Sequence, residues 1–333
     1  ACNLCSLRCP VGIETGTMVL GERARRRDDA DRKAAHWVAG HTGAVETTMK
    51  LGVGAQALSR RVIGNGATDA LAGTLRKLSG ERIPRVSRAL RPGPGTPKTP
   101  PAQESPLGEV VYFPSCATRM FGAPTRENGM LPTTDAMVAL LGRAGFAVKV
   151  PEHADGQCCG QPFLSKGFPA EAERVGAPLR KTLDGMAGGG IPVVTDASTC
   201  AKHLREHPGA AKVHDSAEFL VAQVLPRLKI TRKVPAVAVH HNCSAQRLKE
   251  QAAIERIAAA VADKVVVLDS ITCCGYAGDK GLFVPELNAH ATRFGKAQIP
   301  EGCTLGVSTV STCATGLSEH MGIPFVSLAS LLE

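Results

Sequence analysis

Short apolar runs alternate with stretches of helical periodicity through the last two thirds of the chain. In the first part of this region, apolar runs at 110–113, 147–150 and 191–195 predict buried strands. Between the first two runs, one face of a predicted helix carries Met137, Leu140, Leu141 and Ala144. A second helical period covers about 170–187. Because strands alternate with helices, we predict a parallel sheet flanked by helices.

The same order of elements returns in the second part. Its apolar runs predict strands at 236–239, 265–268 and 305–308. One predicted helix has Ile254, Ile257 and Val261 on a single face, and another covers about 284–297. The repeat predicts an α/β fold with two tandem domains, at 109–232 and 233–333.

The chain before these domains has a different pattern. Residues 18–90 have helical periodicity, and Asp69 and Gly80 would cap and end one helix there. Two apolar stripes predict the core of a small helical bundle; they comprise Leu71, Leu75 and Leu78, and Val45, Met49 and Val53. Residues 91–108 contain six prolines, which exclude a helix or a central strand, so this segment is predicted to be a linker.

Cysteines lie just after the predicted strand ends in both domains. The first domain has Cys116, Cys158, Cys159 and Cys200, and the second has Cys243, Cys273, Cys274 and Cys313. Each adjacent pair is followed by glycine. Neighbouring residues lie closer together than an ordinary disulfide requires, so the pairs are unsuited to bonding each other. In an open α/β sheet, ligands bind beyond the carboxyl ends of the strands.

Four thiolates at one sheet edge suit a [4Fe–4S] cluster. Structural zinc is the alternative metal, although all-cysteine zinc sites usually come from local pairs separated by two residues. A third hypothesis is that only one domain has kept its cluster. Cys303 fits neither group and is interpreted as a core or loop thiol.

Three further cysteines stand at the start of the chain. Cys2, Cys5 and Cys9 have the spacing C-x2-C-x3-C-P, which closes the bacterial ferredoxin run. We therefore predict the last part of a [4Fe–4S] ferredoxin-like domain at 1–17, with one ligand upstream of Ala1. A zinc knuckle is the less favoured alternative. Since the chain begins without Met, we expect it to be a fragment or a processed piece.

Composition limits the classes of partner. The chain is 44% hydrophobic and has no run as long as a membrane span. Aromatic residues make up 4% of the chain, which argues against stacking on nucleic acid. The net charge of +9 suits an acidic partner or an anionic membrane surface, although clusters such as Arg23 to Arg27 are usually solvated faces.

The Cys-Cys-Gly modules resemble the CCG cysteine-rich domain family. The stretches Phe113-Pro-Ser-Cys116, Cys158-Cys-Gly-Gln-Pro-Phe163, Cys273-Cys-Gly-Tyr-Ala-Gly-Asp279 and Ser311-Thr-Cys313 are similar to the iron–sulfur part of FAD-linked D-lactate dehydrogenases and glycolate oxidase-type oxidoreductases. Cys5-Ser-Leu-Arg-Cys9-Pro-Val-Gly-Ile13 is similar to the ferredoxin segment of the same proteins. The resemblance covers residues 1–15 and 109–333.

This resemblance implies a function. Electrons from FAD, on an upstream domain or a partner subunit, would pass through the clusters toward a quinone or cytochrome acceptor. The substrate would be D-lactate or a similar 2-hydroxy acid, and all eleven cysteines other than Cys303 would bind clusters. The expected location is the cytoplasm, with contact at the inner face of the membrane as a further hypothesis.

Two alternatives remain at this point. The heterodisulfide reductase pattern ends each module with C-x2-C, whereas this chain has Cys200-Ala-Lys-His203 and Cys313-Ala-Thr-Gly316. The missing cysteines lower the prospect of a thiol–disulfide redox catalyst of that kind. A zinc-stabilised interaction protein is the second alternative, and it does not explain the ferredoxin-like start.

Overall fold

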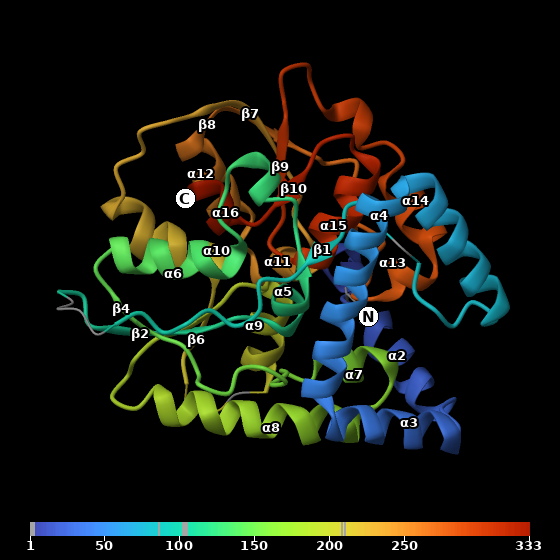
Figure 1. Cartoon of the computed structure of the whole chain (residues 1–333). Coiled ribbons are helices and arrows are strands. Elements are labelled where there is room, and N and C mark those ends of the chain that lie inside the picture. Colours follow the sequence, from blue (N-terminus) through green and yellow to red (C-terminus); the bar gives the residue numbers. More distant parts are fainter. Residues whose placement is uncertain (1–3, 86, 102–105, 208, 210) are drawn as a thin grey trace.

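Two parallel four-stranded sheets organise the molecule (Figure 1). A computed structural model describes residues 4–85, 87–101, 106–207, 209 and 211–333. The strands of the first sheet are β2 (Glu109–Phe113), β4 (Ala147–Lys149), β5 (Val193–Thr195) and β6 (Val213–Asp215). Those of the second are β7 (Val234–Val239), β8 (Ala262–Val267), β9 (Leu305–Val307) and β10 (Phe325–Val326). We call residues 109–232 the first module and residues 233–333 the second module.

Both sheets have the same strand order. The first runs β4-β2-β5-β6 and the second runs β8-β7-β9-β10, with every neighbouring pair parallel. Counted along the chain, each order is second, first, third, fourth. This agreement confirms the predicted α/β class and the internal repeat. It also adds a fourth strand to each module, because β6 and β10 are too short to give a clear apolar run.

Helices cover both sheets. Those of the first module are α5 (Cys116–Met120), α6 (Thr133–Arg143), α7 (Gln161–Lys166), α8 (Pro169–Met186), α9 (Ser198–Glu206) and α10 (Ser216–Phe219). Those of the second are α11 (Cys243–Leu248), α12 (Gln251–Val261), α13 (Lys280–Phe283), α14 (Pro285–Thr292), α15 (Ser311–His320) and α16 (Leu328–Leu332). Short helical turns lie at Arg126–Asn128, Leu220–Val224, Leu225–Arg227 and Lys296–Gln298.

The two modules share one hydrophobic core. Helix α6 of the first module contacts α16 of the second, and α10 contacts both α12 and α16. Leu140 and Ile257, from the helix faces predicted above, are fully buried in this core together with Val110 and Val237 of the two central strands. The modules are therefore packed together by apolar burial, the main driving force of association.

The N-terminal helices do not all behave as predicted. They are α1 (Leu4–Arg8), α2 (Thr15–Arg25), α3 (Asp29–Gly40) and α4 (Thr42–Leu78), which contains a break at Gly64 with φ 79°. Val53 is buried and Met49 packs beside it, but they contribute to the core of the second module and not to the core of a helical bundle as predicted. The other prediction is wrong, because Leu71, Leu75 and Leu78 are 53%, 47% and 80% exposed.

Asp69 also differs from its predicted role. It lies inside α4 and accepts hydrogen bonds from Arg60 and Arg88 instead of capping a helix. Gly80 does follow the end of α4 with a left-handed φ of 61°, as its predicted role as a stop requires.

The predicted linker is tied to the first module. Its first residues form β1 (Arg91–Pro92), which pairs antiparallel with β3 (Phe121–Gly122) just after α5. This two-residue edge strand is compatible with proline. Within the described residues, we find no helix with the length and apolarity that crossing a membrane demands.

Candidate metal centres

The cysteines lie at the topological switch point of each sheet, where the chain connections from two neighbouring strands run to opposite sides. In the first sheet, β2 and β5 are neighbours, and the chain continues from β2 to one side and from β5 to the other. Cys116 begins α5 directly beyond β2, and Cys200 lies in the first turn of α9 beyond β5. Ligands of open α/β sheets bind in the crevice at such a switch point. The second module repeats the arrangement with Cys243 on α11 and Cys313 on α15.

Four thiols come together in the first module. Cys116 interacts with Cys158 through a side-chain hydrogen bond, and Cys158 interacts with Cys159 in the same way. The Sγ atoms of Cys159 and Cys200 are 3.4 Å apart. Cys200 also lies within electrostatic range of Cys116 and Cys158. These four residues form the first cysteine set, as the sequence predicted.

The second module gathers its four cysteines similarly. The Sγ atoms of Cys274 and Cys313 are 3.0 Å apart, and Cys273 interacts with Cys274. Electrostatic interactions with Cys243 and Cys273 also contribute to raising the pKa of Cys313. We call these four residues the second cysteine set. Cys303 is buried outside both sets and donates a hydrogen bond to the carbonyl oxygen of Leu305.

The glycine after each cysteine pair has the same role in both modules. Gly160 and Gly275 have left-handed φ angles of 95° and 72°. A Cβ atom at either position would collide with a carbonyl oxygen of the following helix region, Ala172 or Leu287. Each glycine N–H donates to the Sγ atom of the first cysteine of its pair at 3.4 Å. Hydrogen bonds of this kind stabilise a thiolate that binds metal.

The two sets favour neutral thiols when no metal compensates their charge. A hydrogen bond with Cys158 and then burial raise the pKa of Cys116 well above its ordinary value. A hydrogen bond with Cys274 and burial likewise raise the pKa of Cys273. Metal binding must therefore displace these protons, and several positive charges are needed to hold four thiolates together.

The four thiols of each set could serve as ligands of a polynuclear cluster. In a [4Fe–4S] cluster each thiolate binds its own iron, so the four sulfurs need not converge on a single point. Together with the N–H donors of Gly160 and Gly275, this makes the two sets suitable for iron–sulfur clusters.

The N-terminal cysteines have a more open environment. Cys5 is exposed and accepts a hydrogen bond from Thr15 Oγ1 at 2.7 Å, which lowers the pKa of its thiol. Hydrogen bonds from the backbone of Ile13 and Val11 lower the pKa of Cys9. Both shifts increase the fraction of thiolate, the form that binds metal, relative to an ordinary cysteine. Cys2 lies outside the described residues, so its role stays a prediction.

This N-terminal segment rests on both modules. Helix α1 contacts α11, and Arg247 donates to Ser6 Oγ at 2.7 Å and pairs with Glu14 at 3.2 Å. Helix α2 contacts α7, where Arg23 and Arg27 donate to carbonyl oxygens of the last residues of that helix. Cys5 and Cys9 therefore belong to a segment that contacts α11, the first helix of the second module.

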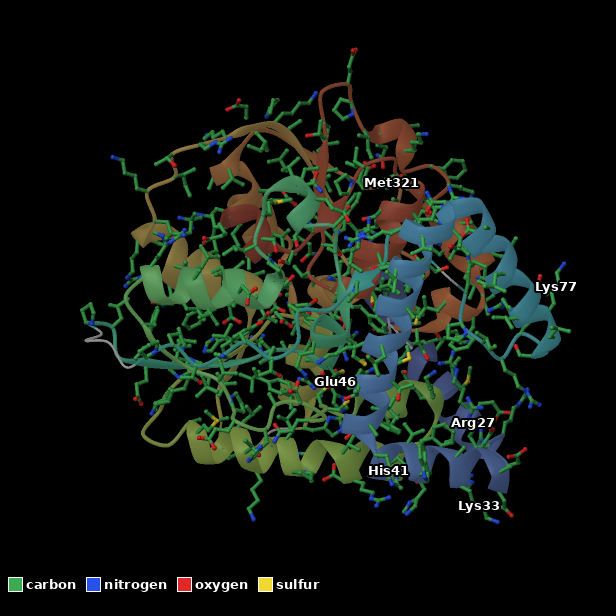
Figure 2. All side chains as sticks on the ribbon, viewed as in Figure 1. Arg27, Lys33, His41, Glu46, Lys77 and Met321 are labelled. Atoms are coloured by element: carbon green, nitrogen blue, oxygen red, sulfur yellow. The ribbon has the colours of Figure 1, made fainter. Side chains whose placement is uncertain are left out.

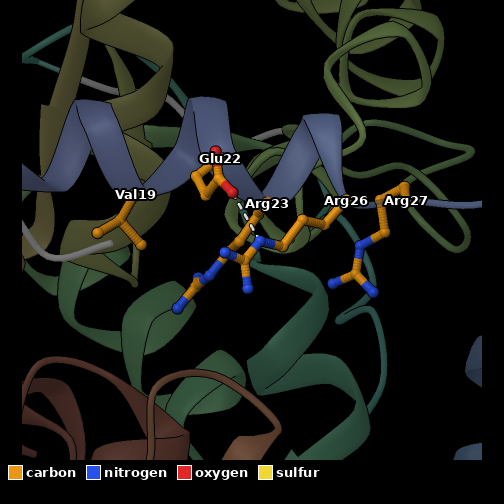
Figure 3. Close-up of a pocket in the computed structure, with 5 residues that line it drawn as sticks. All are labelled: Val19, Glu22, Arg23, Arg26 and Arg27. Atoms are coloured by element: carbon orange, nitrogen blue, oxygen red, sulfur yellow. Dashed lines mark hydrogen bonds and ion pairs between the residues drawn. The ribbon is translucent and has the colours of Figure 1, made fainter.

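An arginine-lined cavity lies on the same segment (Figure 3). It has a volume of about 370 Å³, and its lining residues are Val19, Glu22, Arg23, Arg26 and Arg27. Glu22 pairs with Arg26 at 2.6 Å, and the exposure of Arg26 is 80%. Its lining residues include no cysteine from the part of the chain that the structure describes.

The helices that carry the two sets meet between the modules. Helix α5 contacts α15, and α9 contacts α11. The helix with the first cysteine of each set therefore contacts the helix with the last cysteine of the other set. Ser198 at the start of α9 donates to Asn242 Oδ1 at 3.1 Å and lies 2.9 Å from Thr309 Oγ1. These buried polar bonds connect the chain segments next to Cys200, Cys243 and Cys313.

A buried ion pair beside the first set was missed by sequence reasoning. Arg119 is fully buried, and Glu46 of α4 holds it by two hydrogen bonds of 3.0 and 2.8 Å. Figure 2 shows Glu46 on the inward side of α4, whereas Lys77 projects from the far end of that helix. Arg119 stands three residues after Cys116, which is a signal the sequence contains, but nothing in the sequence links it to Glu46.

The positions of the two missing cysteines are filled. His203 is buried, and its Nδ1 atom has no hydrogen-bond partner within the described residues. A Cβ atom on Gly316 would come within 2.5 Å of the Tyr276 ring and 2.7 Å of Asn288 Nδ2. The second module therefore has no room for a fifth cysteine side chain at this position.

Comparisons with known proteins agree with the geometry of the first module. Residues 110–205 match the family model described as CCG, cysteine-rich domain. A stretch of 162 residues is 27% identical to lactate utilization protein A from Geobacillus sp. (strain WCH70). The match covers 43% of this chain and 65% of the relative, less than two thirds of its length.

Proposed function

We propose that the chain is an iron–sulfur electron-transfer unit with a [4Fe–4S] cluster in each cysteine set. The observation that carries this proposal is the paired arrangement itself: four thiols at the switch point of each sheet, with a glycine N–H donor to one of them. The match of residues 110–205 to the cysteine-rich domain model supports it.

Such clusters accept and release single electrons without breaking covalent bonds. The protein's own residues bind, orient and shield them. Cys158, Cys159 and Cys200 are buried, as are Cys274 and Cys313, so water has little access to most of the ligands. The N–H groups of Gly160 and Gly275 would partly offset the negative charge on the sulfur atoms.

We further propose a place in 2-hydroxy acid oxidation. The chain would relay electrons from FAD, held by an upstream domain or a partner subunit, to a quinone or cytochrome acceptor. The resemblance to D-lactate dehydrogenases supports this, as does the role that the relative's name states, lactate utilization. Contact with an anionic membrane surface remains a prediction from the charge of +9.

Cluster content is the first test. Anaerobically purified protein should be brown and contain about four irons per occupied set. Cys159→Ser and Cys274→Ser should each remove one set of irons and the corresponding EPR signal after reduction. Cys303→Ser is the matched control, because this buried thiol lies outside both sets, and it should keep the full iron content. Stoichiometric zinc without iron would refute the proposal.

The source of electrons is tested separately. With the flavin-bearing partner present, anaerobic D-lactate should reduce the clusters and produce the EPR signal that dithionite produces. If dithionite reduces the clusters but neither D-lactate nor glycolate does, the cluster assignment stands and the hydroxy acid assignment is wrong.

A further inference from the structure

One residue of the first module and one of the second make the same backbone connection. Arg119 and Gln246 each stand three residues after the first cysteine of their set. Gln246 Nε2 donates to the carbonyl oxygens of His241 at 2.7 Å and Thr272 at 3.2 Å. Arg119 donates to Pro114 at 2.6 Å and Gln157 at 2.8 Å.

The accepting carbonyls are equivalent in the repeat. Pro114 and His241 each stand two residues before the first cysteine, and Gln157 and Thr272 each precede the cysteine pair. Both side chains therefore tie the end of the central strand to the loop that carries the pair. The connection needs a donor of suitable length, and the amide of Gln246 shows that it does not need a charge.

The charge distinguishes the first module. Arg119 is fully buried and also contacts the face of the Phe113 ring, 5.8 Å from its centroid. Burying a guanidinium is unfavourable unless a counter-charge compensates it. Glu46 provides that counter-charge from outside the module, and the backbone N–H of Gly156 and the ammonium of Lys50 hold Glu46 at 3.0 and 3.2 Å.

The guanidinium lies against the loops of the first set. It donates to the carbonyl oxygens of Pro114 and Gln157, and the carboxylate of Glu46 divides its negative charge between Arg119 and Lys50. These two cations outnumber the buried carboxylate of Glu46, and the Asp155 carboxylate, 3.8 Å from both, is 66% exposed, so solvent screens its charge. In the second set, the corresponding position holds the neutral amide of Gln246.

We propose that Arg119, held by Glu46, makes the first cysteine set the more strongly oxidising of the two cluster sites. Reduction adds one electron to the cluster and no compensating bond, so the extra negative charge must be balanced by its surroundings. Among the described residues, a buried guanidinium supplies this balance in the first module and not in the second. The inference rests on the proposed function, since it concerns the clusters that the two sets would hold.

A difference in potential would set the direction of electron transfer between the two sets. Electrons that reach the second set would move to the first, where reduction is more favourable. Arg119 is thus a positioning and tuning residue, because it acts through the cluster ligands and their loop.

The test is a potentiometric EPR titration of the iron-loaded full chain. Cys159→Ser and Cys274→Ser assign each signal to its set. In the wild-type protein, the signal of the first set should have the higher midpoint potential. In the double variant Glu46→Gln/Arg119→Gln, that signal should shift to a more negative potential, while the signal of the second set and the iron content stay unchanged.

Two further variants separate charge from structure. Arg119→Lys keeps the positive charge and should keep a potential near that of the wild type. Arg60→Gln/Asp69→Asn removes another arginine–carboxylate pair of α4, with a 2.8 Å contact, and should shift neither signal. If the double variant does not fold, Glu46→Gln alone, which removes only the counter-charge, should shift the signal of the first set to a more positive potential, and an unchanged potential would oppose the proposal.

The two proposals can fail independently. A wild-type chain without iron–sulfur signals refutes the proposed function. A chain with two signals that respond equally to Glu46→Gln/Arg119→Gln, or with no response, keeps the proposed function and refutes the role of Arg119.

Discussion

The two modules share their backbone and differ in their charges. Both sheets have the same strand order, both cysteine pairs end in a left-handed glycine, and both loops are tied to the central strand by one side chain. That side chain is Arg119 in the first module and Gln246 in the second. The comparison teaches that the geometry around four thiols can be kept while the electrostatic environment changes.

The modules also differ in the length of their first crossover. Cys116 and Cys158 are 42 residues apart, whereas Cys243 and Cys273 are 30 residues apart. The longer crossover contains β3, which pairs with β1 of the linker segment. The extra residues thus connect the first module to the N-terminal part of the chain, and the switch point itself is unaffected.

The largest predicted effect on stability tests whether the glycines that follow the two cysteine pairs are equivalent. Gly160→Ala and Gly275→Ala should each destabilise the protein by about 3 kcal/mol, because a left-handed backbone and a collision with a carbonyl oxygen act together. The free energy of unfolding from urea titration is the measurement. A large loss at one position only would break the comparison between the modules.

Two other glycines serve as matched controls for this prediction. Gly189 and Gly278 both have a φ of 79°, but no atom lies within 4 Å of a Cβ built on either. Alanine at these positions should cost only about 1 kcal/mol, the penalty for the left-handed conformation itself. Equal losses at all four positions would mean that the close approach of the helices contributes nothing.

A medium effect is predicted for two neighbouring buried carboxyl groups, one from each module. Burial raises the pKa of Asp215 to about 6, and burial together with Asp215 raises the pKa of Glu250 well above 4.5. Arg205, 4.0 Å from Glu250, lowers the pKa of Glu250, whereas the nearby carboxylate of Glu218 raises it. Arg205 therefore offsets only part of the increase. The folded protein therefore holds a proton here that the unfolded chain releases near its ordinary pKa.

Stability from this pair should decrease as the pH rises. The stabilisation is complete below the pKa of a carboxyl group in the unfolded chain. It is lost as the pH rises toward the raised pKa values of the folded protein, at up to about 1.4 kcal/mol per pH unit. Wild-type protein should thus unfold more easily at about pH 9 than at about pH 6. Glu250→Gln, which stays neutral, should reduce this difference, and an unchanged pH profile would contradict the shared proton.

The smallest effect concerns a surface pair between the modules. Lys166 of the first module and Asp279 of the second are 2.5 Å apart, but both side chains are more than a third exposed. Lys166→Ala should change the free energy of unfolding by less than about 1 kcal/mol. A larger loss in urea titration would indicate that polar contacts, and not the shared apolar core, hold the modules together.

Much of the fold could be predicted because short apolar strands and helical stripes repeat in order. The faces with Leu140 and Ile257 are buried as predicted. The cysteine sets were predictable because their residues follow strand ends. The predicted strand at 191–195 begins only at Val193, because Pro192 has no N–H to donate, and the helix predicted over 284–297 ends at Thr292.

Tertiary contacts explain what the sequence could not predict. The stripe of Leu71, Leu75 and Leu78 has the spacing of a core face, yet periodicity does not say whether another element covers it. Val53 on the same helix is covered by the second module. Glu46 is likewise a single acidic residue among helical neighbours, and only the fold brings it to Arg119, 73 positions further along the chain.

The contact between Glu46 and Arg119 also has a consequence for folding. If α4 separated from the first module, Arg119 would remain in the interior without its counter-charge, at a cost of about 3–5 kcal/mol. Partial detachment of the N-terminal helices therefore carries this electrostatic cost in addition to the loss of apolar contacts. The helices and the first module should lose structure in one cooperative step, although the proline-rich segment between them suggests two separable parts.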